Sequence, residues 1–174
     1  CHDYRLLMRE WSKLAKTAGL RMRAFAKVAE LPVFFIESPA SAQAEEAMWH
    51  YISAGVHGDE PAPPWGLLEW AQENVNLLRT RPFLLFPTLN PVGLTLNTRA
   101  DHRGVDLNRA FNSESDPLIV AWRQVLGDRK LATALCLHED YDGQGCYVYE
   151  LTHLKDSLGQ SILRDTVRIN LPAH

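Results

Sequence analysis

Residues 47–90 of the chain read AMWHYISAGVHGDEPAPPWGLLEWAQENVNLLRTRPFLLFPTLN, and this stretch decides the fold. Its two ends, 47–55 and 82–89, are apolar runs typical of buried strands. Between them, prolines crowd the start of a segment that continues with apolar residues on one side, as in a helix whose first turn accepts proline. These apolar residues are Leu67, Leu68, Trp70, Ala71 and Val75. The stretch therefore predicts a strand, a helix and a second strand.

The flanking sequence continues this alternation of strands and helices. Apolar residues recur every three and four positions over 3–18, which predicts a helix, and Gly19 ends it. Further helices are expected over 118–126 and 152–168. Strands are expected over 20–28, where apolar residues recur every two positions, and over the largely apolar runs 32–38, 131–137 and 146–151. The polar stretches predict a loop over 39–46 and a long segment without regular structure over 90–116. The alternation predicts an α/β fold, namely a mixed, mostly parallel central sheet with helices on both faces.

The composition fits one globular domain over residues 1–174. The chain is 46% hydrophobic and 22% charged, which excludes disorder, collagen and coiled coil. A formal net charge of −3 argues against nucleic-acid binding, and no apolar run approaches the roughly 20 residues of a membrane span. Three cysteines and the lack of a signal-peptide pattern favour the cytoplasm, and Cys136 is expected to pack as a small hydrophobe.

Residues that can bind a metal follow two of the predicted strands. His57 and Glu60 stand three residues apart in a loop that enters a helix, and His138 closes the apolar run 131–137. Because ligands collect at the carboxyl ends of strands in open α/β sheets, these loops are expected to converge. Two histidines and one glutamate are a known donor set for zinc, with the fourth position left to water. Each signal by itself is weak, since HxxE occurs by chance and most strand-end histidines are structural.

The most specific cluster is RADHRGVDLNRAF at 99–111. Arg99, Arg103, Asn108 and Arg109 place three guanidinium groups and an amide in one loop. A guanidinium group suits a planar carboxylate because it donates two parallel hydrogen bonds. A solvated basic loop is the alternative, and for Arg103 alone it is the favoured one.

Taken together, the three clusters resemble the zinc metallocarboxypeptidases, which comprise the carboxypeptidase A-like exopeptidases and the bacterial murein-peptide amidases. HGDE, an NP-G turn, R-x-x-x-x-GVDLNR-x-F and a strand-end histidine occur here in the order of that family. The resemblance covers roughly residues 47–151, and GVDLNR after the NP-G turn is its most specific part.

The resemblance implies a role for each matching residue. Arg99 corresponds to the arginine that polarises the scissile carbonyl and stabilises the oxyanion. Asn108 and Arg109 correspond to the pair that holds the terminal carboxylate of the substrate, so the expected partner is a peptide with a free C-terminal carboxylate. The implied zinc ligands are His57, Glu60 and His138.

The chain departs from this family after the third zinc ligand. The family's general base is a glutamate from a strand well downstream, but only 36 residues follow His138 and none of their segments resembles that strand. The sequence therefore predicts a catalytic domain that lacks its C-terminal part and that, by itself, binds zinc with little or no hydrolysis. Glu139 and Glu150 are weaker candidates for the base and are expected to have supporting or structural roles.

The leading interpretation is a zinc carboxypeptidase that removes a C-terminal amino acid from a peptide. A murein-peptide amidase and an aspartoacylase- or succinylglutamate desuccinylase-like deacylase remain as alternatives, because these relatives share HxxE, NR and the third histidine. A further alternative, favoured only by the missing base, is a non-catalytic module that binds zinc or peptides.

Overall fold

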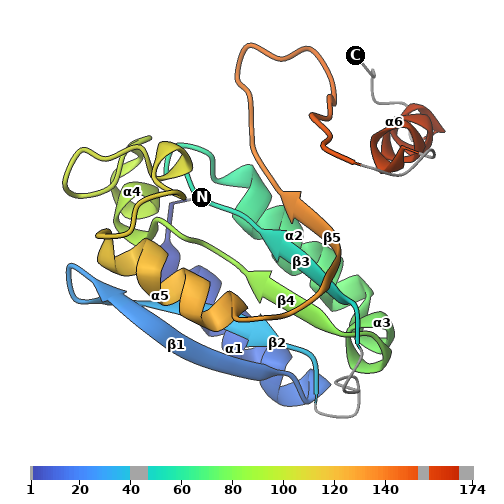
Figure 1. Cartoon of the computed structure of the whole chain (residues 1–174), viewed down its shortest axis with the longest axis horizontal. Coiled ribbons are helices and arrows are strands. Elements are labelled where there is room, and N and C mark those ends of the chain that lie inside the picture. The colour runs from blue at the N-terminus through green and yellow to red at the C-terminus, as the bar shows by residue number, and fades with distance from the viewer. Residues whose placement is uncertain (1, 40–46, 153–156, 169–174) are drawn as a thin grey trace. The chain divides into compact units, whose positions relative to one another are not determined.

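The computed structural model describes residues 2–39, 47–152 and 157–168. The chain divides into two compact units, Cys1–Glu139 and Asp140–His174. The first unit contains a mixed five-stranded sheet with helices on both faces, which confirms the predicted fold class (Figure 1). The assignment of residues 1–174 to one domain stays a prediction.

The sheet brings the carboxyl ends of two strands to one edge. Its strands are β1 (Arg21–Val28), β2 (Leu31–Glu37), β3 (Trp49–Ser53), β4 (Phe83–Phe86) and β5 (Leu131–Cys136), in the spatial order β1-β2-β4-β3-β5. β2 pairs antiparallel with β1 and β4, whereas β3 pairs parallel with β4 and β5. The loops that follow β3 and β5 therefore start side by side.

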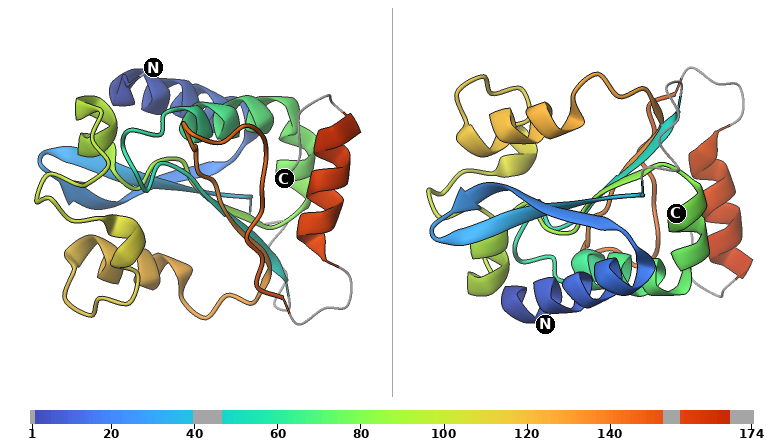
Figure 2. Two further views of the ribbon diagram at one scale, coloured as in Figure 1. Left: turned by 90° about the horizontal axis from the view of Figure 1, so that it is seen from above. Right: turned by 90° about the horizontal axis from the view of Figure 1, so that it is seen from below.

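Alternating strand residues build one core on each face of the sheet. Ile36, Ile52 and Leu85 pack toward the helices on one face, and Phe35, Tyr51 and Phe86 toward the other. The first face carries α1 (Tyr4–Ala18), α2 (Ala62–Glu73) and α3 (Val75–Thr80), and the second carries α5 (Pro117–Leu126) (Figure 2). Successive side chains of a strand point to opposite faces of the sheet. Because helices cover both faces here, both sets of side chains are apolar and the strand sequences are nearly continuous apolar runs.

Aspartate side chains cap two of the helices that the sequence predicts, α1 and α5. Asp3 caps α1 by accepting from the N–H of Leu6 at 2.9 Å, and Gly19 ends this helix in a left-handed conformation. Asp116 caps α5 by accepting from two N–H groups of its first turn. The single helix expected to carry the apolar residues from Leu67 to Val75 is in fact two helices, because α2 ends at Glu73 and α3 begins at Val75.

The stretch 90–116, expected to lack regular structure, contains two short helices. They are α4 (Pro91–Leu96) and the 3₁₀ helix η2 (Leu107–Arg109). The side chain of Asn90 accepts from the N–H of Gly93, and that of Asp106 accepts from the N–H of Asn108. These local caps stabilise helices too short to show an apolar period in the sequence.

In the second unit, the predicted C-terminal helix is confirmed as α6 (Leu158–Arg168). The strand expected over 146–151 is wrong, because only Cys146 forms a bridge and no ladder partner exists among the described residues. Tyr149 and Leu151 are 94% and 96% exposed. Residues 40–46 of the expected loop lie outside the described residues, as do 153–156.

No helix in the described part of the chain combines the length and the apolar character needed to cross a membrane.

Candidate metal centre

Three side chains predicted to bind a metal lie together at the carboxyl ends of β3 and β5. His57 and Glu60 stand in the loop between β3 and α2, and His138 follows β5. One ligand atom from each residue lies within 4.8 Å of the other two. Nδ1 of His57 is 2.6 Å from Oε1 of Glu60, and Nδ1 of His138 is 2.9 Å from Oε2. The three residues converge although their segments are far apart in the chain.

The chemistry of these side chains suits a metal ion. Nδ1 of both histidines faces the carboxylate of Glu60. A cation bound between these three side chains would take the place of the protons in the two hydrogen bonds. Two neutral imidazoles and one carboxylate also leave coordination positions free for water or substrate. His57 and Glu60 are 2% and 4% exposed, whereas the side chain of His138 is 32% exposed. The open approach therefore lies on the side of His138.

A backbone contact between two glycines positions the loop that carries His57. A Cβ atom on Gly58 would lie 1.9 Å from the carbonyl carbon of Gly93 in α4, so only glycine fits there. The N–H of Gly58 also donates to the carbonyl of Thr98 at 3.1 Å. The loop is therefore held against the segment that leads directly into Arg99.

Hydrogen bonds keep Glu60 ionised although it is buried. Burial alone raises the pKa of its carboxyl, but hydrogen bonds from His138, His57 and the N–H of Glu139 outweigh burial and lower the pKa to about 2. For His57, burial and the charge of Arg99 lower the pKa, but the hydrogen bonds to Glu60 and Asp106 and the charge of Glu60 outweigh them and raise the pKa. The centre thus keeps a carboxylate charge at neutral pH and attracts cations.

Asp106 belongs to the site although sequence analysis did not single it out. Its Oδ1 accepts from Nε2 of His57 at 3.1 Å, and its Oδ2 accepts from Nε of Arg99 at 3.3 Å. Burial raises the pKa of Asp106, but the hydrogen bond and charge of His57 and the charge of Arg99 outweigh it and lower the pKa. Asp106 therefore joins His57 to Arg99 of the basic loop. The signal that could have revealed it is the acid inside GVDLNR.

Arg99 lies beside the three converging side chains. Its Nη1 is 3.7 Å from Oε1 of Glu60, and its side chain is 50% exposed. The buried Asn90 donates from Nδ2 to the carbonyl of Arg99 at 3.3 Å and accepts from Gly93 through Oδ1. The NP-G turn of the sequence thus fixes the backbone of Arg99, whose action on a carbonyl stays a prediction.

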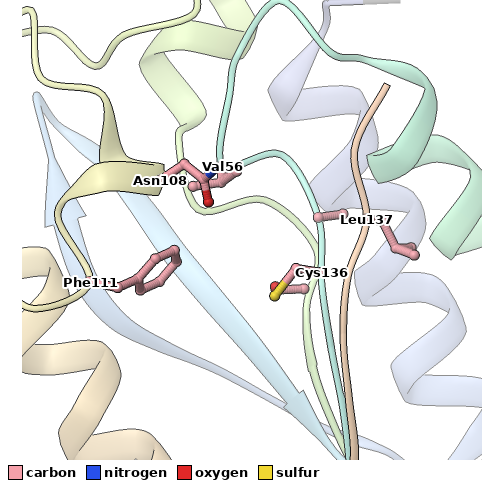
Figure 3. A pocket seen from close by; sticks show the side chains of 7 residues that line it. Val56, Asn108, Phe111, Cys136 and Leu137 are labelled. Carbon is pink, nitrogen blue, oxygen red and sulfur yellow. The ribbon is translucent and has the colours of Figure 1, made fainter. Parts of the chain in front are cut away.

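A small hollow opens beside Asn108, and its lining carries no acidic or basic side chain. Figure 3 shows Asn108 and Phe111 on one side and Cys136 on the other. Its volume of about 10 Å³ gives room for about one water molecule. Cys136, expected to be buried, is instead exposed. The remaining lining residues are Ser53, Ala54, Val56 and Leu137.

The two other arginines of the loop 99–111 differ in their surroundings. Arg109 is exposed, and the described residues provide it with no ion-pair partner. Arg103 is engaged, because its Nη2 is 2.7 Å from Oδ2 of Asp101 and 2.5 Å from Oδ2 of Asp116. Arg109 is therefore free to bind a carboxylate, whereas Arg103 ties the loop to the start of α5.

The two glutamates considered as general base both accept hydrogen bonds from helix N-termini. Oε2 of Glu139 accepts from the N–H of Ala62 at 3.0 Å, at the start of α2. Glu150 accepts from the N–H groups of Leu158 and Gly159, at the start of α6. These contacts are structural, and no other residue in the described part of the chain is assigned as the base.

Residues 48–134, half of the chain, match the model of the succinylglutamate desuccinylase/aspartoacylase catalytic domain. The chain belongs to this family. The matched stretch of the desuccinylase/aspartoacylase domain includes His57, Glu60 and the GVDLNR string. No curated protein matches the chain.

Solved structures place this desuccinylase/aspartoacylase family member among metallopeptidase-like folds. A candidate metallopeptidase from Shewanella baltica OS155 is 26% identical with a TM-score of 0.79, over 98% of this chain and 68% of its own. Another from Shewanella denitrificans OS217 is 25% identical with a TM-score of 0.79, over 94% and 64%. Carboxypeptidase A from Helicoverpa armigera shares the fold, with 16% identity and a TM-score of 0.69, over 91% and 50%. The chain thus spans about two thirds of the first two proteins and half of the third.

Proposed function

We propose that the chain is the metal-binding part of a zinc carboxypeptidase, which hydrolyses the amide bond to a C-terminal amino acid with a free carboxylate. The observation that carries this proposal is the convergence of His57, Glu60 and His138 beside Arg99. The family and the neighbouring folds support a metal-binding hydrolase. The His₂Glu donor set favours zinc among the common metals.

The residues around the metal divide the chemistry between them. His57, Glu60 and His138 would hold the zinc ion, which when bound would supply an activated water near neutral pH and polarise the scissile carbonyl. The Arg99 guanidinium stabilises negative charge that develops on the carbonyl oxygen, which lowers the barrier because the charge is larger in the transition state. Asn108 and Arg109 hold the substrate carboxylate and so determine which amide bond lies over the metal.

A second candidate function is the deacylation of an N-acyl amino acid, and the family match favours it. The chemistry is the same, because both reactions release an amino acid whose free carboxylate can bind Asn108 and Arg109. The two differ only in what lies on the acyl side of the scissile amide bond.

The test compares substrates on the purified, zinc-loaded chain. Peptides ending in Lys, Arg or Phe are assayed beside N-acetylaspartate, N-succinylglutamate and a murein tripeptide, with C-terminally amidated peptides as controls. Because the chain by itself is expected to hydrolyse little, we expect its residual zinc-dependent release of a C-terminal residue to come from free-acid peptides alone. Faster release from an N-acyl amino acid or from the murein peptide would replace the carboxypeptidase by the corresponding alternative. Zinc and peptide binding without turnover is the result shared by an incomplete catalytic domain and a non-catalytic module.

Two histidine variants test the metal site itself. His57→Ala is expected to abolish stoichiometric zinc binding, because it removes one of three protein ligands. His102→Ala, an exposed histidine in the loop 99–111, serves as the matched control and should bind zinc like the wild type. Equal zinc content in both variants would show that the metal site is assigned wrongly.

A further inference from the structure

Glu139 contacts both ends of the short segment that carries the Glu60 ligand. Its backbone N–H donates to Oε2 of Glu60 at 3.1 Å. Its side-chain Oε2 accepts from the N–H of Ala62 at 3.0 Å. Glu139 also directly follows His138, so a single residue links the two loops that supply metal ligands.

In the first turn of α2, one backbone N–H group lacks a partner within the helix, and Glu139 accepts a hydrogen bond from it. Pro61, at the N-cap, makes no side-chain hydrogen bond, and Pro63 and Pro64 have no N–H group. The N–H of Trp65 reaches the carbonyl of Pro61 at 3.5 Å. Ala62 therefore carries the N–H that needs a partner in the first turn, and the charge of a carboxylate is favoured at this end of a helix.

These contacts lock Glu60 to His138. Glu60 receives hydrogen bonds on Oε2 from both His138 and the N–H of Glu139, while its own loop is tied back by the Glu139 side chain. Without the bond to Ala62, the start of α2 would be free to move away from the end of β5, and Glu60 would move with it.

We infer that Glu139 is a positioning residue of the metal centre: its carboxylate fixes the distance between the Glu60 and His138 ligands. This inference rests on the proposed metal centre. It also gives Glu139 a different role from that of a general base, because the carboxylate is turned onto the backbone of α2.

The test measures zinc affinity by competition with a chromogenic chelator, together with the melting temperature of the metal-free protein. Glu139→Ala removes the acceptor and is expected to weaken zinc binding about 10- to 100-fold, the usual effect of losing a group that orients a ligand. Glu139→Gln keeps an oxygen acceptor of the same length and should bind zinc within about threefold of the wild type. Glu139→Asp, whose carboxylate is one methylene shorter, should resemble Glu139→Ala and replaces it if that variant does not fold.

Asp3→Ala is the matched control, because it removes the carboxylate that caps α1. It should lower the melting temperature with unchanged zinc affinity. If Glu139→Ala behaves in the same way, Glu139 is only a helix cap and the inference is overturned. A wild-type chain that binds no zinc would overturn the proposed metal centre together with this inference, whereas tight binding unaffected by Glu139→Ala would overturn the inference alone.

Discussion

His57 and Asp106 are joined by a hydrogen bond of 3.1 Å between Nε2 and Oδ1. The other ring nitrogen of His57, Nδ1, faces Glu60. When the proton of a neutral imidazole resides on Nε2, Nδ1 carries a lone pair and can bind a metal. Asp106 therefore selects the form of His57 that the metal centre requires.

Replacing Asp106 by alanine should weaken zinc binding about 10- to 100-fold, because His57 loses the acceptor that fixes its tautomer and orientation. Competition with a chelator at constant pH measures the change. Asp128→Ala, which removes an exposed acid beyond the end of α5, is the matched control and should leave the affinity unchanged. Equal affinities of the two variants would contradict the role of Asp106.

Gly58→Ala should disrupt the loop of His57, because the added Cβ would meet the backbone of Gly93 at 1.9 Å. Overpacking typically costs about 1–3 kcal/mol, and a contact with backbone should fall at the upper end of this range, so the metal site should be lost with it. Gly66→Ala is the control within the same region, since nothing lies within 4 Å of its Cβ position in α2. It should stabilise the protein by about 0.5–1 kcal/mol. Urea denaturation and zinc stoichiometry measure both variants; a stable, zinc-binding Gly58→Ala protein would refute the contact.

The sequence alone predicted those helices and strands whose apolar patterns extend over many consecutive residues. The apolar period over 3–18 and the continuous apolar runs at 47–55 and 82–89 predicted their helix and strands. The strand expected over 146–151 failed because alternation of apolar and polar residues shows that a strand is possible, not that a partner strand is there to pair with it.

The sequence likewise predicted only some residues of the candidate site. His57, Glu60 and His138 could be found because strand ends and spacing bring them to one edge of a sheet. Asp106 was not found, and Glu139 was expected only to have a supporting or structural role, since the contacts of both depend on which atom each carboxylate faces across the fold. The sequence does not show which atom the carboxylate of an acidic residue faces in the folded protein.

Asp101 should make the loop 99–111 sensitive to acid. Burial raises the pKa of its carboxyl, but the N–H of Val105 and the side chain and N–H of Arg103 outweigh burial and lower the pKa. Because the folded-state pKa lies below the unfolded value of about 3.9, the ionised carboxylate stabilises the protein above about pH 4. This stabilisation is lost as the pH falls through the folded pKa.

Asp101→Asn should accordingly cost about 1.5–3 kcal/mol at pH 7, the range for hydrogen bonds to a charged group. The difference from the wild type in the free energy of unfolding should shrink below pH 4. Urea denaturation between pH 3 and pH 7 follows it, and a difference that stays constant over this range would show that the charge of Asp101 does not contribute.

Arg109→Ala should weaken the binding of a peptide with a free C-terminal carboxylate by about 1.5–3 kcal/mol, roughly 10- to 150-fold, because a charged hydrogen-bond donor to that carboxylate is removed. Binding of the same peptide with an amidated C-terminus should not change, since the amide carries no charge for the guanidinium to hold. Arg5→Ala, an exposed arginine on α1, is the matched control. Fluorescence anisotropy with labelled peptides measures all of these affinities without requiring turnover. Equal losses for the acid and the amide would mean that Arg109 supports the loop rather than the substrate, and the carboxylate-binding role would then pass to Asn108 and Arg99.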